Sequence, residues 1–292
     1  RPILGLPSDK LAEIVFGISE EAIIVPAHAW TPHFSVFGSE SGFDSLEECF
    51  GRWTDKIFAI ETGLSSSPDM NWRISQLDNI SLISNSDSHS LPRIGREANV
   101  FDTELSFNAI WEAVREKDPK KFLFTIEFFP EEGKYHYDGH RNCSVSFTPK
   151  ETIENKGICP VCSGRVTVGV LSRVEKLADR PEGFTPSRHI PYKNMVPFDQ
   201  IIADAMNIAE TSVKVKAEYQ KLISALGNEI RILLKTPIED IARVSGAKIA
   251  DGVKRVREGK LKIIPGYDGE YGHVKIFSGE IVEDDKAQAT LF

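Results

Sequence analysis

The chain has 292 residues, of which 41% are hydrophobic and 27% are charged, as is ordinary for a globular protein of one or two domains. No apolar run approaches the roughly 20 residues needed to span a bilayer. The formal net charge of −8 argues against a protein that coats nucleic acid nonspecifically, but it leaves room for a local basic face. The chain opens with Arg1-Pro2, without a starting Met or signal sequence, so we expect it to be part of a longer polypeptide.

Strands alternate with helices over the first 128 residues, which predicts an α/β fold with a parallel sheet. The expected elements, in chain order, are a helix over 8–18, a buried strand over 22–25, a long Gly/Ser/Phe-rich loop over 34–43, a helix over 45–51, a strand over 56–60, a helix over 68–77, a strand over 80–84, a helix over 103–117 and a strand over 121–128. Ser8 and Thr103 are the expected N-caps of the first and last helices. The first helix places Leu11, Ile14 and Val15 on one face.

Residues of metal-binding types follow three successive predicted strands. These residues are His28, Glu61 and the pair Asp87 and His89. In parallel α/β folds, sites are built at this edge of the sheet, and on an extended backbone Asp87 and His89 face the same way. Asp and His together suit zinc, manganese or iron, so the pattern predicts a metal site. For Asp87 and His89 alone, a polar loop with a capping Asp and a solvated His is the alternative.

Two arginines, Arg93 and Arg96, follow shortly after this pair. Because Arg can make bidentate contacts with phosphate, both are candidates for holding a substrate phosphate. A plain surface pair explains them equally well. His33, in the loop after His28, is an alternative further ligand for the metal site.

The Pro-Ala-His element that ends at His28 and the Ser-Asp-Ser-His element that ends at His89 resemble the last motifs of the PHP metallohydrolase superfamily. Its members are distorted (β/α) barrels that bind two or three metals and hydrolyse phosphoesters. The resemblance implies that His28, Asp87 and His89 bind divalent metals (Zn, Mn or Mg), with Glu61 at the catalytic site beside them. The superfamily also has an earlier His-x-His element and an intervening Glu and His. None of these precedes His28, so we expect this chain to hold only the later part of the barrel.

Three of the four cysteines, Cys143, Cys159 and Cys162, lie within 20 residues of one another. The Cys-x-x-Cys element followed by Gly has the form of a zinc knuckle, and His140-x-x-Cys143 supplies a second pair of ligands. Together they predict a closed Cys₃His zinc site of structural type, in a reducing compartment such as the cytoplasm. His136 is the alternative fourth ligand, and three unrelated reduced cysteines are the plainest alternative.

Residues suited to nucleic acid lie around the cysteine module and in the C-terminal third. Tyr137 and Arg141 are of the types that stack on bases and hold phosphates, although a surface hairpin with local packing is the alternative. Farther along, 186–197 is expected to be an irregular linker, followed by helices over 198–208 and 211–225 and two more within 237–257. Six basic residues in 15 positions then form a strip suited to a phosphate backbone, or a solvated helix face. The expected DNA contacts of this basic strip are Lys254, Arg255, Arg257 and Lys260.

The order of these elements is distinctive. The PHP-type site, the Tyr-His-Tyr-Asp-Gly-His module with its cysteines, and Pro-Gly-Tyr-Asp-Gly-Glu-Tyr-Gly over 265–272 together resemble the endonuclease Q family along nearly the whole chain. The resemblance implies a prokaryotic, archaeal-type DNA-repair enzyme that nicks DNA on the 5′ side of hypoxanthine, uracil, xanthine and abasic sites. The alternatives are a PHP phosphatase acting on a small phosphoester and a non-catalytic nucleic-acid-binding module.

Four parts are therefore expected: a partial PHP domain over 1–130, a zinc-binding ribbon over 131–168, a mainly helical DNA-binding domain over 169–280 and a flexible tail over 281–292. In the tail, Gln288 and Leu291 resemble the start of a Gln-x-x-Leu clamp-binding peptide. This resemblance implies docking on the sliding clamp PCNA.

Overall fold

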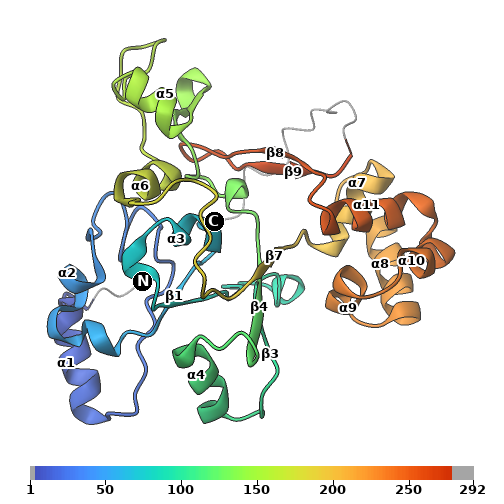
Figure 1. Cartoon of the computed structure of the whole chain (residues 1–292). Helices are drawn as coiled ribbons and strands as arrows, with labels where there is room; N and C mark the ends of the chain where they lie inside the picture. Colours follow the sequence, from blue (N-terminus) through green and yellow to red (C-terminus); the bar gives the residue numbers. More distant parts are fainter. Residues whose placement is uncertain (1–3, 278–292) are drawn as a thin grey trace. The chain divides into compact units, whose positions relative to one another are not determined.

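The computed structural model describes residues 4–277 (Figure 1). The chain divides into two compact units: Arg1–Pro197 with Ile263–Val274, and Phe198–Lys262 with Lys275–Phe292. The first unit is mixed α/β and the second is helical. The expected four-part division is finer than this and stays a prediction. The clamp-binding residues Gln288 and Leu291 lie outside the described residues.

The first sheet brings two of the predicted strand ends together. Strand β1 (Ala59–Glu61) pairs in parallel with β2 (Ser81–Ile83), as the alternating pattern predicts, and Glu61 is in register with Ile83. The strand expected over 22–25 does not form. That segment approaches β1 only near its end, where Pro26 O accepts from Glu61 N at 3.0 Å. Because Pro26 has no N–H to donate, it cannot continue a regular ladder.

The second sheet contains two strands that the sequence pattern did not reveal. Strand β4 (Phe122–Glu127), predicted from its apolar run, pairs antiparallel with β3 (Ala98–Phe101) and parallel with β7 (Tyr192–Asn194). The expected irregular linker over 186–197 is therefore wrong for its central residues. Both missed strands have at most four residues, and every residue of β3 is only half-buried. Short, half-buried strands produce no run of apolar residues.

The helices of the first unit are α1 (Ser8–Ile18), α2 (Leu46–Phe50), α3 (Pro68–Trp72), α4 (Phe107–Glu116), α5 (Pro149–Glu154) and α6 (Val170–Leu177). The expected caps of the first and last predicted helices were wrong. Pro7 precedes α1 and Ser8 lies inside it, where its hydroxyl donates to Cys49 O at 2.6 Å. Ser106 caps α4 by accepting from Ala109 N, because it directly precedes the first helical residue. The helix expected over 68–77 ends at Trp72.

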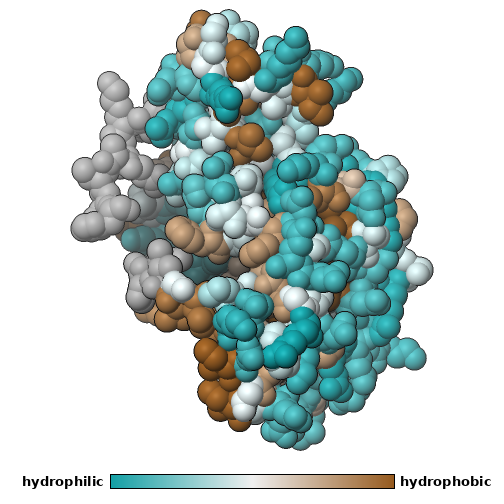
Figure 2. Space-filling view, turned by 90° about the vertical axis from the view of Figure 1, so that its left-hand side faces the viewer, coloured by the Kyte–Doolittle hydropathy of each residue, from teal (hydrophilic) through white to brown (hydrophobic). Residues whose placement is uncertain are grey.

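Helix α1 turns apolar side chains outward. Its buried residues are Ala12 and Phe16, whereas Leu11 and Ile14 are exposed. Figure 2 shows the molecule from the left-hand side of Figure 1. Apolar patches lie in the lower part of that view, the end at which Figure 1 places α1. The apolar face was predicted, but its direction was not, because helical spacing does not reveal which apolar residues meet the core.

The Gly/Ser/Phe-rich loop after His28 is a packed element. Trp30 and Phe37 are fully buried, with their ring centroids 4.8 Å apart, and the indole of Trp30 donates to Asn71 Oδ1 at 2.7 Å. Arg173 of α6 donates to Phe37 O at 2.9 Å and to Phe43 O at 2.8 Å. Each buried large apolar side chain contributes about 1.5–3 kcal/mol, so this loop is part of the core rather than a plain surface connection.

The cysteine module forms a hairpin of β5 (Asp138–His140) and β6 (Val145–Phe147), followed by α5. A later segment between β8 (Lys262–Ile264) and β9 (His273–Lys275) folds back onto this hairpin. Asp268 in that segment accepts from Arg141 N and from Thr167 Oγ1, both at 2.6 Å. The Pro-Gly-Tyr-Asp-Gly-Glu-Tyr-Gly motif therefore stabilises the module.

The second unit consists of helices α7 (Phe198–Met206), α8 (Val213–Leu226), α9 (Glu229–Leu234), α10 (Ile238–Ser245) and α11 (Ala247–Arg257). The helices predicted over 198–208, 211–225 and within 237–257 are confirmed, and α9 was missed. The core of the second unit includes the fully buried Ile201, Leu222 and Ile241. None of the helices in residues 4–277 combines the length and apolarity required to cross a membrane.

Candidate metal centres

The predicted strand-end residues converge on one site, which we call the strand-end site: His28, Glu61, Asp87 and His89. Asp87 Oδ2 lies 3.4 Å from His28 Nε2 and 3.6 Å from His89 Nε2. On its other side, the His28 ring places Nδ1 3.5 Å from Glu61 Oε2. Parallel pairing of β1 and β2 brings Glu61 and the loop of Asp87 and His89 to the same edge. His28 follows no strand, and its backbone N–H is held there by the Glu61 carboxylate.

Glu61 connects the segment of His28 with the segment after β2 through hydrogen bonds. Its carboxylate accepts from His28 N at 2.8 Å and from Asn85 Nδ2 at 3.0 Å. Gly63 packs against the same turn, where a Cβ would lie 2.6 Å from His28 Nδ1. His28 and Asp87 have positive φ angles of 46° and 41°, a region that residues other than glycine seldom occupy. Such strain persists only where the surroundings enforce it, and it is common at functional sites.

The strand-end site is open to solvent. The side chains of Asp87 and His89 are 41% and 78% exposed, and that of His28 is 26% exposed, whereas that of Glu61 is 10% exposed. Two imidazoles and a carboxylate suit a divalent cation of borderline hardness. The residues present therefore fit as part of a metal's ligand set, with Glu61 placed to orient His28.

The two predicted phosphate-binding arginines lie in the segment that follows Asp87 and His89. Arg96 donates from Nε to Ser86 O at 3.1 Å, and its guanidinium lies 5.6 Å from the ring centroid of Phe128. Arg93 ends a short 3₁₀ turn, η3 (Leu91–Arg93), and is half-buried. His33, the alternative ligand, is exposed and packs loosely beside Phe34, with the ring centroids 6.2 Å apart.

Two buried carboxyl groups lie behind the site, and the sequence pattern missed both. Glu127, at the end of β4, accepts from Thr62 Oγ1 at 2.9 Å and from Thr125 Oγ1 at 2.5 Å, and burial raises its pKa to about 7. Burial and the nearby Glu127 raise the pKa of Glu97 to about 8. Glu97 is therefore mostly uncharged at neutral pH, which limits the negative charge near Glu61. The only signal was the position of Glu127 at a strand end.

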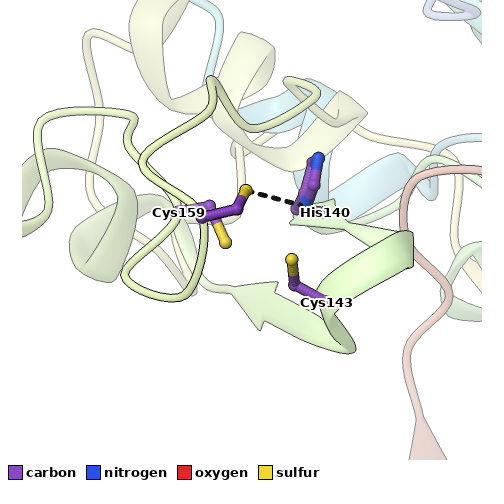
Figure 3. A group of neighbouring side chains, drawn as sticks. His140, Cys143 and Cys159 are labelled. Atoms are coloured by element: carbon purple, nitrogen blue, oxygen red, sulfur yellow. Dashed lines mark hydrogen bonds between the residues drawn. The ribbon is translucent and has the colours of Figure 1, made fainter.

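The second centre is the cysteine cluster, formed by His140, Cys143, Cys159 and Cys162. The ligand atoms of all four lie within 4.8 Å of one another. Figure 3 shows the labelled His140, Cys143 and Cys159 close together; His140 ends β5, Cys143 ends the 3₁₀ turn that follows it, and Cys159 lies in the later Cys-x-x-Cys element. Gly164 closes the knuckle by accepting from Cys159 N at 2.8 Å, and a Cβ there would lie 3.3 Å from Cys162 Sγ.

The chemistry of the cluster fits zinc. Local desolvation and hydrogen bonds with the other two thiols raise the pKa of Cys143 to about 11. A bound zinc ion reverses this effect, because it binds thiolates and stabilises their charge. Four protein ligands suggest a structural zinc site. His140 occupies the fourth position, while the alternative ligand His136 is buried and stacks on Tyr137, with centroids 5.4 Å apart.

The predicted DNA contacts of the module are partly engaged within the first unit. Tyr137 is half-buried, and its backbone N–H donates to Gly266 O at 2.9 Å. The exposed Arg141 forms an ion pair with Glu270, with Nε and Oε1 3.8 Å apart. DNA contacts by these two side chains stay predictions.

The basic strip of the second unit contains residues of two kinds. Arg257 donates to three backbone carbonyls, at 2.6–2.8 Å, those of Ile232, Leu233 and Thr236. The others pair with nearby carboxylates on or after α11: Arg255 with Asp251, and both Lys254 and Lys260 with Glu258. These ion pairs are exposed and therefore weak, so these side chains can still be recruited by a phosphate. Their DNA contacts also stay predictions.

Known proteins resemble both units of this chain. Residues 197–260 match the family model of the MJ0043 C-terminal domain. The crystal structure of the lesion-specific endonuclease PfuEndoQ from Pyrococcus furiosus superposes with a TM-score of 0.84 and 33% identity, covering 96% of this chain and 70% of that one. The chain belongs to the endonuclease Q family.

Other relatives extend this similarity. Endonuclease Q in complex with a 27-mer duplex that carries an abasic lesion at the active site matches with a TM-score of 0.81 and 32% identity, covering 98% of this chain and 71% of that one. MJ0043 of Methanocaldococcus jannaschii is 30% identical over 90% of this chain and 33% of its own length. YqxK of Bacillus subtilis is 32% identical over 87% of this chain and 61% of its own length. The chain thus spans about a third and about three fifths of these two curated relatives.

Proposed function

We propose that this chain acts in a metal-dependent DNA-repair endonuclease that nicks DNA on the 5′ side of deaminated bases (hypoxanthine, uracil, xanthine) and abasic sites. The observation that carries the proposal is the convergence of His28 and His89 on Asp87, at the edge where β1 and β2 end. Its support is that a similar solved structure holds a duplex with an abasic lesion at its active site. In this proposal, the first unit contains part of a PHP-type distorted (β/α) barrel.

Each residue then has a defined task. His28, Asp87 and His89 hold divalent metal, and Glu61 fixes the orientation of His28 through its backbone N–H. Bound metals lower the pKa of a water molecule and neutralise the phosphate oxygens. Arg93 and Arg96 hold a phosphate that flanks the scissile bond.

The remaining parts serve binding. Tyr137 and Arg141 on the zinc ribbon, together with the basic strip of the second unit, contact the DNA backbone and bases. Gln288 and Leu291 dock the enzyme on the sliding clamp PCNA. We place the enzyme in the prokaryotic cytoplasm, where its DNA substrate lies.

The test is the substitution Asp87→Asn, assayed for nicking of duplexes that contain uracil, hypoxanthine or an abasic site, with Mn²⁺ present. Nicking should fall by about 100-fold or more, because removing a direct ligand harms a metal site at least as much as removing an outer partner. DNA binding should be retained. The matched control is Asp55→Asn, another exposed carboxylate, which should nick as the parent does.

Three outcomes separate the alternatives. Equal nicking by the Asp87→Asn variant and the parent removes Asp87 from the site. Hydrolysis of p-nitrophenyl phosphate by the parent without DNA nicking favours a small-molecule phosphatase. DNA binding without any hydrolysis favours a binding module.

A further inference from the structure

Phe34 has the most exposed aromatic side chain in residues 4–277, at 84%. It lies six residues after His28, in the loop that leads away from the strand-end site. We propose that the Phe34 ring stacks on a nucleobase of the DNA substrate next to that site. This inference rests on the proposed nuclease function, and it assigns a residue and a ligand group that the function alone does not.

The backbone of Phe34 is in a conformation that requires enforcement. Its φ angle is 59°, in the left-handed region that bulky L-residues rarely enter. Such a conformation costs about 1–2 kcal/mol per residue. A ring that is 84% exposed buries little apolar surface, so it contributes little to the free energy of folding. A role in contact with a ligand explains why the loop presents it.

The loop around Phe34 is held by its own hydrogen bonds. Phe34 N donates to Ser41 Oγ at 3.1 Å, and Gly42 N donates to Gly38 O at 2.9 Å. A Cβ on Gly42 would lie 2.2 Å from Gly38 N. The two backbone segments of the loop therefore approach each other so closely at Gly42 that only glycine fits there. Trp30 and Phe37 are fully buried at the base of the loop, so the backbone that carries the Phe34 ring is anchored before a ligand arrives. Preorganisation of this kind reduces the entropy lost on binding.

The same loop is connected to the strand-end site. The single hydroxyl hydrogen of Thr31 can be donated to His28 O or to His33 O, each 3.3 Å from Oγ1, which keeps the turn from His28 to Phe34 compact. Exposed apolar side chains also follow the other strand end, where Leu91 is 84% exposed and Ile94 is 68% exposed. Both loops that leave the site therefore carry exposed apolar groups.

A nucleobase is the ligand that suits this arrangement. Stacking on an aromatic side chain contributes about 1–3 kcal/mol per base and is independent of sequence. Apolar wedges that enter a duplex also unstack neighbouring bases. At an abasic site, or where a base has been flipped out, a base has lost a stacking neighbour and the Phe34 ring can replace it.

The experiment measures binding without cleavage, in the Asp87→Asn background. Fluorescence anisotropy gives the dissociation constant for an abasic duplex before and after Phe34→Ala. We expect binding to weaken about 5- to 160-fold, the equivalent of one lost stack. Phe34→Trp should keep the affinity and Phe34→Leu should not, because only the first retains an aromatic face. Ile18→Ala, which removes an equally exposed apolar side chain on α1, should bind as the background protein does.

The outcomes distinguish this inference from the proposed function. Binding that is unchanged by Phe34→Ala, or fully kept by Phe34→Leu, overturns the stacking role and leaves the nuclease assignment intact. Failure of the background protein to bind any DNA overturns both. Thermal melting of each variant confirms that the loop and its core remain folded.

Discussion

The two candidate metal centres of this chain are built in opposite ways. In the cysteine cluster, four ligand atoms lie within 4.8 Å of one another and form a complete set. In the strand-end site, Asp87 Oδ2 lies between two imidazole nitrogens at 3.4 and 3.6 Å, and the side chains of Asp87 and His89 are 41% and 78% exposed. A closed set of protein ligands leaves no position for substrate, whereas an open set leaves such positions free.

The supports of the two centres also differ. The cysteine cluster depends on local turns, such as the bond from Cys159 N to Gly164 O. The strand-end site depends on distant segments, because Glu61 binds His28 N across 33 residues and Asn85 across 24. Locality explains why ligand spacing alone predicted the cysteine cluster, while the prediction of the strand-end site also needed an assumption about how strands pair. The contrast predicts that the cysteine cluster is needed for folding and the strand-end site for activity.

The largest expected effect is the loss of the cysteine cluster. Cys159→Ser should release about one zinc ion per chain and unfold the ribbon, because structural zinc contributes on the order of 10 kcal/mol to small metal-dependent folds. Zinc analysis by mass spectrometry and hydrogen exchange of residues 136–169 would measure both effects. By contrast, Asp87→Asn should change the free energy of unfolding by less than about 1 kcal/mol, since its side chain is half-exposed.

A matched control exists in the same unit. Cys49 is buried and its Sγ lies 3.2 Å from Ser8 Oγ, away from the other cysteines in sequence. Cys49→Ser should keep the full zinc content. If Cys159→Ser also kept it, the assignment of the cluster as a zinc site would be wrong.

An intermediate effect separates two histidines of one segment. His140 belongs to the cysteine cluster, whereas burial lowers the pKa of His136 to about 4, with Asp69 opposing the shift. The folded state therefore disfavours protonation of His136. Its contribution to stability is complete above pH 6.5 and is lost as the pH falls from about 6.5 to 4. The shift corresponds to about 3 kcal/mol.

Urea unfolding at pH 7 and at pH 4.5 measures this loss. His136→Phe replaces the imidazole with another aromatic ring that can stack on Tyr137 but cannot titrate. The free energy of unfolding of this variant should therefore fall less on acidification than that of the parent. His33→Gln, which replaces an exposed imidazole, should show the acid sensitivity of the parent. An unchanged acid response in His136→Phe would assign the effect to other groups.

The elements that the sequence revealed are those with a local signal. β1, β2 and β4 have apolar runs, and the helices of the second unit have amphipathic spacing, apart from the short α9. β3 and β7 lack such runs, because their stability comes from pairing with β4. The same limit applies at the site. Glu97 and Glu127 were missed because only the folded chain shows that their carboxyl groups are buried.

Convergence of Glu61 with Asp87 and His89 was predictable because the parallel strands β1 and β2 share an edge, whereas His28 reaches the site without the strand expected before it. The details of the site were not predictable. The positive φ angles of His28 and Asp87, and the use of the Glu61 carboxylate to hold His28 N, depend on contacts between distant segments. Nor could the sequence distinguish Arg257 from its basic neighbours, since the carbonyls that it binds belong to another helix and the turn after it.

The smallest expected effects concern this basic strip. Arg257 donates to carbonyls at the C-terminal end of α9, whereas Lys260 is 70% exposed and pairs only with Glu258 at 2.8 Å among the described residues. Arg257→Ala should lower the free energy of unfolding by about 1–2 kcal/mol, because these carbonyls lose a charged donor. Lys260→Ala should change it by less than about 0.5 kcal/mol. Chemical unfolding of both variants measures the difference.

DNA binding should show the reverse order if the exposed residues of the strip contact phosphates. Lys260→Ala should weaken binding similarly for all sequences and reduce the slope of log affinity against log salt concentration by about 1. Arg257→Ala should leave that slope unchanged once binding is measured well below its melting temperature, because its guanidinium is engaged with backbone carbonyls. A slope that changes for Arg257 and not for Lys260 would mean that Arg257 leaves α9 to bind phosphate. The strip would then be part of the open, ligand-binding class of sites rather than the closed, structural one.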